Sequence, residues 1–177
     1  MYKVILIFVP VIIVLVLIAI IIKKKGTFIL KKLNMAEKEI DNCLKNKKEL
    51  LEASIPLLTK ELKLEDFLTD FDSFFEKDVN NYEMHDFLNE TYISFKNKTF
   101  DITKKIKSKE LNENIDKLKN CDIELNGVIK YYNDIGLAFN IFIKKFQVNL
   151  FKLIFGYKKK VLFNEEKKEI FDILNDK

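Results

Sequence analysis

The sequence predicts an all-α protein in which an N-terminal transmembrane helix is followed by an antiparallel three- to four-helix bundle with long helices. Three observations support this fold class. First, only four glycines and two prolines occur in 177 residues, so the chain has few of the residues that form tight turns in sheet proteins. Second, an uncharged apolar segment lies near the N-terminus. Third, apolar residues repeat every seven positions in the C-terminal half, as they do along packed helices.

The N-terminal apolar segment comprises residues 4–22, with the sequence VILIFVPVIIVLVLIAIII. At about 1.5 Å per residue, this length spans close to 30 Å, the thickness of a bilayer core. A cleaved signal peptide is the main alternative, but the segment exceeds the usual ~7–15 apolar residues and no small-residue cleavage site follows it. We therefore expect a retained transmembrane helix, which tolerates Pro10 near its start.

Residues 23–34 form a basic juxtamembrane collar that contains five lysines, whereas Lys3 and the terminal amine precede the apolar segment. The positive-inside rule then places the N-terminus outside and the C-terminal domain in the cytoplasm. The net charge of +4 comes from this N-terminal part, because six lysines precede Glu37, the first acidic residue. We expect a single-pass protein of the cell membrane that contacts the lipid bilayer through its N-terminal helix and binds no nucleic acid.

Residues 35–163 are predicted to form the helical bundle. Apolar residues recur at steps of three and four from 36 to 62, which predicts a helix with a kink at Pro56. A second run from 67 to 95 predicts another helix, which its polar stretch DVNNYEMHD could interrupt. The polar residues 96–110 predict a loop, and residues 164–177 predict a short, charged, helical tail.

The third apolar run gives the clearest prediction. Its members recur every seven residues, with a second series three positions later: Leu118, Cys121, Leu125, Val128, Tyr132, Ile135, Phe139, Phe142 and Phe146. This pattern is typical of an amphipathic helix in a bundle or coiled coil. Gly127 and Gly136 fall within it, and each costs about 1 kcal/mol relative to Ala, so we expect a neighbouring helix to approach closely at both.

Residues 131–160, YYNDIGLAFNIFIKKFQVNLFKLIFGYKKK, combine aromatic and basic side chains in the manner of a membrane-seeking segment. The apolar repeat assigns the first half to the bundle core. If the second helix returns antiparallel to the first, a third helix of about 35 residues, roughly 50 Å long, ends far from the bilayer. The predicted connectivity therefore moves the second half away from the membrane, unless the second helix is shorter or broken.

The same segment resembles the C-terminal signature of the LemA family, bacterial proteins with one N-terminal transmembrane helix and a cytoplasmic helical bundle. Gln147 stands where that family usually has Pro, Tyr157 replaces Phe and Leu162 replaces Tyr, while SIPLLT around Pro56 resembles a second family element. The resemblance implies a tethered antiparallel bundle and carries over no established catalytic activity. The matching residues are Tyr132, Asn133, Asn140, Phe146, Asn149, Phe155, Gly156, Tyr157 and Phe163.

Two interpretations of the signature asparagines remain open. Asn133 and Asn140 could bond to a neighbouring helix, or to the backbone where the third helix turns into VNLFKLIFGY. Alternatively, they form the polar rim of an aromatic patch that binds a partner protein, with nearby lysines orienting an acidic partner. Asn149 is a candidate N-cap for a short final helix that carries Leu150, Leu153 and Ile154.

The sequence contains no recognisable catalytic constellation. His85 is the only histidine, and we expect it to lie exposed or half-exposed beside Asp86. Cys43 and Cys121 lack metal-ligand spacing and fall on apolar stripes, so we expect two buried free thiols. The acidic groups elsewhere are interpreted as solvated or helix-starting charges: Glu65, Asp66, Glu165, Glu166 and Glu169.

Together with the expected transmembrane helix, the lack of a recognisable catalytic constellation predicts a protein that uses no cofactor and no metal and is not an enzyme. The favoured function is protein–protein contact with an unknown partner, as a scaffold or regulator of another membrane component. The alternative is a lipid-contacting sensor or membrane-remodelling module. An enzyme that uses a cavity of the bundle is the third hypothesis.

Overall fold

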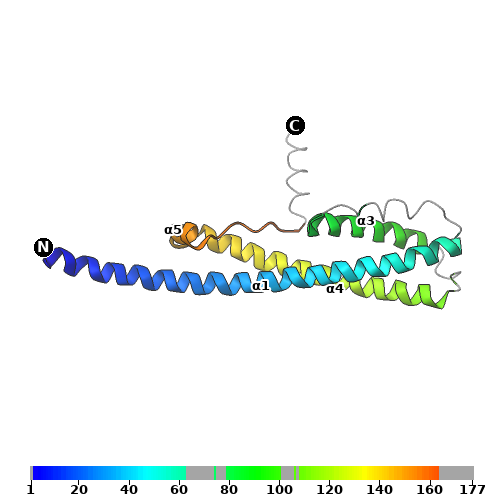
Figure 1. Ribbon diagram of the computed structural model, residues 1–177, viewed down its shortest axis with the longest axis horizontal. Helices are drawn as coiled ribbons and strands as arrows, with labels where there is room; N and C mark the ends of the chain where they lie inside the picture. Colours follow the sequence, from blue (N-terminus) through cyan, green and yellow to red (C-terminus); the bar gives the residue numbers. More distant parts are fainter. Residues whose placement is uncertain (1, 63–73, 75–78, 101–105, 107, 164–177) are drawn as a thin grey trace, which may run out of the picture. The chain divides into compact units, whose positions relative to one another are not determined.

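The computed structural model describes residues 2–62, 74, 79–100, 106 and 108–163, apart from the side chains of residues 2–8, 62, 100 and 146. The regular elements of this described part are all helices, which confirms the all-α class: α1 (Tyr2–Leu62), α3 (Asn81–Phe100), α4 (Lys109–Lys144) and α5 (Phe146–Phe155) (Figure 1). The chain divides into a terminal unit, Met1–Glu37 with Lys130–Lys177, and a central unit, Lys38–Ile129.

Helix α1 joins segments that the sequence analysis treats separately. The predicted apolar segment, the basic collar and the first bundle helix form one helix of 61 residues, which passes through Pro56 without ending. From Leu33 onward a single stripe is buried, including Ile40, Leu44 and Leu51. Over the residues whose side chains the structure describes, which begin at Val9 in α1, no helix is long and apolar enough to cross a membrane.

In the central unit, α1 and α4 run antiparallel. The Cys121 thiol lies 3.6 Å from the carbonyl oxygen of Cys43, and the Ser108 amide lies 3.3 Å from a Glu61 carboxylate oxygen. Buried Leu51 and Leu118 contribute to the core between these helices. This part of the chain therefore matches the predicted antiparallel packing.

Helix α3 contradicts the predicted up-and-down order, because it runs parallel to α1. Asn81, at the start of α3, bonds to Asp41, whereas Tyr92, further along, lies under the ammonium of Lys47 at 4.7 Å. Both helices thus advance in the same direction (Figure 1). The interpretation of the second apolar run as a returning helix is wrong for α3.

The polar stretch DVNNYEMHD contains the start of α3, and Val79 and Asn80, just before it, are not helical. The Asn80 side chain accepts hydrogen bonds from the amides of Tyr82 and Glu83 at 3.0 and 3.1 Å, and the Glu83 carboxylate accepts from the Asn80 amide at 3.1 Å. This reciprocal arrangement is a capping box. Most of the earlier part of the second run, including Phe67 and Phe71, lies outside the described residues.

The predicted loop at 96–110 is shorter than expected at both ends. Helix α3 continues to Phe100, and α4 starts at Lys109. The Ser108 hydroxyl caps α4 by accepting a hydrogen bond from the Leu111 amide at 3.1 Å. The predicted C-terminal tail, residues 164–177, lies outside the described residues.

In the terminal unit, α4 also runs antiparallel to α1, so its C-terminal end lies beside the basic collar. The Tyr132 hydroxyl lies 3.3 Å from Glu37, and the Lys25 ammonium lies 5.8 Å from the centre of the Phe142 ring. The sequence-based prediction that this end is remote from the apolar segment is therefore wrong. Because α3 runs parallel to α1, α4 is the helix that returns.

The main series of the predicted seven-residue repeat of α4 is confirmed, whereas Val128 and Ile135 of the second series are half-buried. Leu118, Leu125, Tyr132 and Phe139 are all at most 2% exposed. The helix ends at Lys144, and Lys145 adopts an extended conformation before α5 begins at Phe146. Helix α5 is capped at its C-terminus by Gly156 in the left-handed conformation, with φ of 65°.

Candidate functional site

Most of the residues that carry the family resemblance lie in or beside a non-helical segment, residues 157–163, which we call the C-terminal segment. Asn140 donates a hydrogen bond to the carbonyl of Lys160 and accepts one from its amide, both at 2.8 Å. Asn133 makes the same pair of bonds with Phe163, at 3.1 and 2.9 Å. Each asparagine side chain therefore pairs with the segment as a neighbouring β-strand would.

The spacing of these two asparagines matches the spacing of their partners. Seven residues of helix separate Asn133 from Asn140, which is about 10.5 Å at 1.5 Å per residue. Three residues separate Lys160 from Phe163, which is about 10 Å for an extended chain. The two pairs of bonds can therefore form together without strain, and they hold the segment antiparallel to α4.

Tyr132 and Glu37 anchor the same segment from the side. The Tyr132 hydroxyl lies 3.1 Å from the carbonyl oxygen of Val161 and 3.3 Å from Glu37, and it can donate its single hydrogen to either acceptor. Glu37 also accepts a hydrogen bond from the Lys160 ammonium at 2.9 Å. The Phe163 ring meets the Tyr132 ring edge-on at 5.6 Å.

Tyr157 fixes the other end of the C-terminal segment. Its buried ring contacts Phe139 edge-on at 5.7 Å and Phe155 at 5.6 Å, and its hydroxyl lies 3.4 Å from the carbonyl oxygen of Lys23. Burial raises the pKa of this phenol. Gly26 leaves the space that the ring occupies, because a Cβ there would overlap the hydroxyl and ring atoms of Tyr157.

Gly136 and Gly127 differ in what they allow. A Cβ at Gly136 would lie 2.5 Å from Leu162, so this glycine lets the C-terminal segment pack against α4. No described atom lies within 4 Å of a Cβ built at Gly127. The predicted close approach of a neighbouring helix is therefore wrong at Gly127. At Gly136 the nearest neighbour is the C-terminal segment, and Leu33 of α1 lies 3.8 Å from the same Cβ position.

The structure thus brings together most of the residues that carry the family resemblance. Asn133 and Asn140 bond to the backbone, as in the first of the two interpretations, although their partners follow α5. Asn149 departs from its predicted role: Lys145 occupies the N-cap position, and Asn149 lies exposed inside α5. The side chain of Phe146 lies outside the described residues. Binding of a partner protein by this group stays a prediction.

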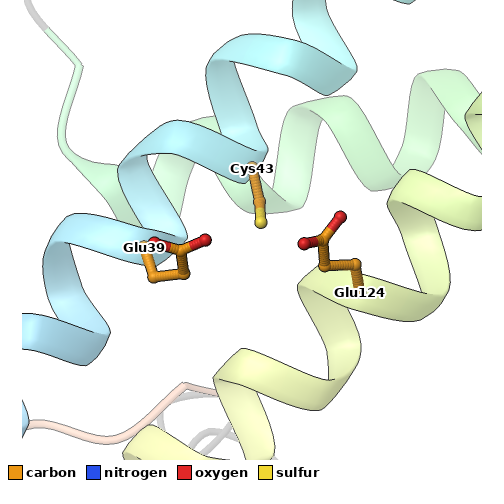
Figure 2. A group of neighbouring side chains, drawn as sticks. All are labelled: Glu39, Cys43 and Glu124. Atoms are coloured by element: carbon orange, nitrogen blue, oxygen red, sulfur yellow. The ribbon is translucent and has the colours of Figure 1, made fainter.

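A second group of polar side chains lies in the central unit (Figure 2). Glu39 and Cys43 are one turn apart on α1, and Glu124 reaches toward them from α4; their potential ligand atoms lie within 4.8 Å of one another. A thiol and two carboxylates are donors that Zn²⁺ accepts. Burial raises the pKa of the Cys43 thiol to about 11, and the charges of Glu124, Cys121 and Glu39 add to the increase, so a metal ion would have to displace the thiol proton to bind there.

Both cysteines are free thiols and both are buried, which confirms their predicted burial. Burial also raises the pKa of Cys121, while the nearby Lys47 ammonium acts in the opposite direction. Neither thiol therefore has the lowered pKa that marks a reactive cysteine.

Lys47 is a buried charge that the sequence analysis missed. It is 1% exposed, its ammonium lies 2.6 Å from Asp122, and it sits over the ring of Tyr92. Burial, followed by the charge of Asp122, raises the pKa of Tyr92. The sequence spacing could have indicated this burial, because Lys47 lies seven residues after Ile40 and therefore on the same buried stripe of α1.

His85 also differs from its prediction. It is buried on α3 at 7% exposure, and its Nδ1 atom lies 3.2 Å from the Asp86 carboxylate. The neighbouring acid was identified correctly, but the exposure was not. The reason is that the face of α3 that carries Leu88 and Tyr92, three and seven residues later, is buried in the core of the central unit.

The chain matches no family model, no curated protein and no solved structure.

Proposed function

We propose that the protein is a membrane-tethered helical bundle that acts through contacts with other molecules and not through catalysis. The main support for this proposal is that the part of α1 before the basic collar has an exposed, apolar surface. Each of the residues from Val9 to Leu17 is exposed, and the large apolar ones are about half exposed. A helix that is apolar on all sides is typical of one surrounded by lipid.

The length of the apolar sequence supports the same proposal. Residues 9–22 continue directly from residues 4–8, whose side chains lie outside the described part, and together they reach the thickness of a bilayer core. Lys23, Lys24 and Lys25 follow at once and are exposed. We propose that these lysines lie on the cytoplasmic side, with the helices that follow them.

Membership of the LemA family is part of this proposal. The residues that carry the resemblance include Asn133, Asn140, Tyr157 and Phe163, which hold the C-terminal segment in place. These residues have a structural role, as we would expect of the residues that are shared within a family defined by its fold. Scaffolding or regulation of another membrane component, through protein–protein contacts, is the function we favour.

Membrane fractionation of cells that express the full chain tests the tether. We expect the protein to stay in the membrane pellet after an alkaline carbonate wash. Two lysines in the apolar segment, Val14→Lys with Leu17→Lys, should release it, because each charge at the centre of a span costs about 2.5–3.5 kcal/mol. The matched control, Met35→Lys with Ile123→Lys, changes exposed apolar residues elsewhere and should stay in the pellet. Release of the unmodified chain by carbonate would refute the tether.

Crosslinking mass spectrometry on the full chain in its native membrane tests the function through protein contacts. We expect a small set of partner proteins linked repeatedly to the exposed lysines of the described helices. Links distributed over abundant membrane proteins in proportion to their amount would argue against a specific scaffold or regulator.

A further inference from the structure

Helix α5 carries apolar side chains on its outer side as well as on its inner side. Val148 is buried, and Phe151 stacks on Phe155 with ring centres 6.0 Å apart. The opposite side forms what we call the outer stripe, made of Leu150 at 61%, Leu153 at 94% and Ile154 at 73% exposure. Steps of three and four residues place these side chains on one line along the helix. Such a contiguous exposed apolar surface indicates a site of contact.

Within the terminal unit, α5 lies at the end of the exposed apolar surface of α1. Tyr157, which follows α5 after one residue, contacts Gly26 and the carbonyl of Lys23. Phe142, just before α5, lies under the ammonium of Lys25. If residues 4–22 cross a bilayer, these contacts place α5 at the depth of the lipid headgroups.

Lysines are the only charged residues in the part of the chain that contains the outer stripe. Residues 135–163 contain six lysines and no acidic residue, and residues 1–36 likewise contain lysines but no acid. Lys145 and Lys158, on either side of α5, are exposed. Lysines next to a membrane segment attract anionic lipid headgroups. An apolar stripe bordered by lysines therefore matches an anionic bilayer better than an apolar protein surface, which would need no such charge.

We infer that α5 is a membrane-surface helix whose outer stripe inserts into an anionic bilayer beside α1, while the neighbouring lysines bind lipid phosphates. Helices of this type bury their apolar face roughly 5–10 Å into the boundary between headgroups and acyl chains. This inference depends on the proposed tether of α1. It adds a second contact with the same leaflet, through which the terminal unit lies against the membrane surface.

Tryptophan reporters can test this position, because the chain contains no tryptophan. The full chain is reconstituted into vesicles of phosphatidylcholine and phosphatidylglycerol, with lipids brominated either near the headgroup or at the bilayer centre. Leu153→Trp reports on α5, Leu15→Trp reports on the tether, and Ile123→Trp is an exposed control on α4. Because the stripe should lie only roughly 5–10 Å deep, we expect Leu153→Trp to be quenched about twofold more by shallow bromines than by central ones.

The three reporters separate failure of this inference from failure of the tether. Quenching of Leu15→Trp by central bromines, with Leu153→Trp unquenched like Ile123→Trp, would leave the tether intact and overturn the membrane role of α5. Absence of quenching at both Leu15→Trp and Leu153→Trp would overturn both. A blue shift of Leu153→Trp without bromine quenching would mean that a second copy of the chain covers the stripe, and it would also overturn the inference.

The role of the lysines is tested by omitting phosphatidylglycerol. Quenching of Leu153→Trp should fall in vesicles of phosphatidylcholine alone, whereas that of Leu15→Trp should not change, because the tether is held by apolar contact. Equal quenching of Leu153→Trp in both types of vesicle would overturn the assignment of anionic headgroups as ligands.

Discussion

A backbone amide that is buried outside a helix or sheet needs another hydrogen-bond partner, and the C-terminal segment finds its partners in side chains of α4. Asn133 and Asn140 each supply a donor and an acceptor, so both polar groups of Phe163 and of Lys160 are satisfied. An amide side chain has the same donor and acceptor as a peptide bond, which explains why this residue type fits.

Asn140→Ala should loosen the C-terminal segment, because the amide and carbonyl of Lys160 lose their partner on α4. Leaving such groups unpaired costs about 1–3 kcal/mol, which corresponds to roughly 5- to 150-fold faster local exchange. Hydrogen-exchange mass spectrometry of residues 157–163 measures this effect. Asn149→Ala, at an exposed asparagine of α5, is the control and should leave the exchange unchanged. Equal protection in both variants would contradict the assigned role of Asn140.

The buried ion pair of the central unit should respond asymmetrically to mutation. Lys47 is 1% exposed and Asp122 is 23% exposed, so Asp122→Asn leaves the more deeply buried charge unpaired and should cost about 3–5 kcal/mol. Lys47→Met should cost less, because the Asp122 carboxylate still reaches water and Asn126. Thermal melting followed by circular dichroism measures both changes. Asp116→Asn breaks an exposed pair with Lys119 and should change stability by less than about 1 kcal/mol; an equal effect at Asp122 would refute the prediction.

Cys43 should titrate in a strongly alkaline range. Its pKa is raised from 9.0 to about 11, so its thiol contributes stability below pH 9.0 that is lost as the pH rises through about 11. We expect the alkylation rate of folded Cys43, followed by mass spectrometry, to rise with a midpoint near 11. Glu124→Gln should lower that midpoint, because it removes a negative charge that opposes the thiolate. Glu113→Gln, an exposed change on the same helix, should not; a shared midpoint for both variants would exclude the proposed cause.

At the scale of helices, two glycines make room for one short segment. Gly26 on α1 accommodates Tyr157, and Gly136 on α4 accommodates Leu162, so both ends of the C-terminal segment pack close to a helix. A glycine inside a helix costs about 1 kcal/mol relative to Ala, and here the tight packing of the segment offsets that cost.

Substituting Ala for the three helical glycines should therefore stabilise the protein at one position and destabilise it at the others. Gly127→Ala should stabilise the protein by about 1 kcal/mol, because a Cβ there meets no described atom within 4 Å. Gly26→Ala should destabilise it and increase hydrogen exchange in residues 157–163, because the ring of Tyr157 must move. Gly136→Ala should have a smaller effect, since only the flexible end of Leu162 is displaced. Thermal melting ranks the three; stabilisation by Gly26→Ala would refute the contact with Tyr157.

The helices were largely predictable from the sequence because an amphipathic stripe is a local pattern. The repeat from Leu118 to Phe142 predicted which face of α4 is buried, but such a pattern does not identify what covers that face. The direction of α3 was missed for this reason, since a helix presents the same stripe when it is reversed. Lys47 was missed because a lysine on a buried stripe becomes stable only through partners far away in the sequence, Asp122 and Tyr92.

The sequence predicted which residues belong to the candidate site, but not the contacts that they make. Asn133 and Asn140 stood out through the family resemblance, whereas their partners lie 30 and 20 residues further along. The C-terminal segment has no helical or strand periodicity of its own, so no local rule indicates that it pairs with α4. Asn149 was predicted to be an N-cap because asparagine is favoured at that position, but α5 starts earlier, directly after the extended Lys145.

For the molecule as a whole, the distribution of charge along the chain carries the clearest functional information. Acidic residues are absent from residues 1–36 and 135–163, both of which belong to the terminal unit, whereas residues 38–129 contain most of the acids. Within residues 1–36, five lysines follow the apolar part of α1, whereas Lys3 alone precedes it. A charge difference of this kind controls the orientation of a single span.

Orientation provides the final prediction. Ile123→Cys places a thiol at an exposed position of α4, while the native Cys43 and Cys121 are buried. A membrane-impermeant maleimide should label this variant only after the cells are permeabilised, because the positive-inside rule predicts that the lysines at 23–25, 31 and 32 lie on the cytoplasmic side. Changing these five lysines to Gln removes the charge difference and should increase the fraction labelled in intact cells. The chain without Ile123→Cys controls for the native thiols. Labelling of Ile123→Cys in intact cells with all five lysines present would reverse the proposed orientation, and the positive-inside argument for this chain would fail.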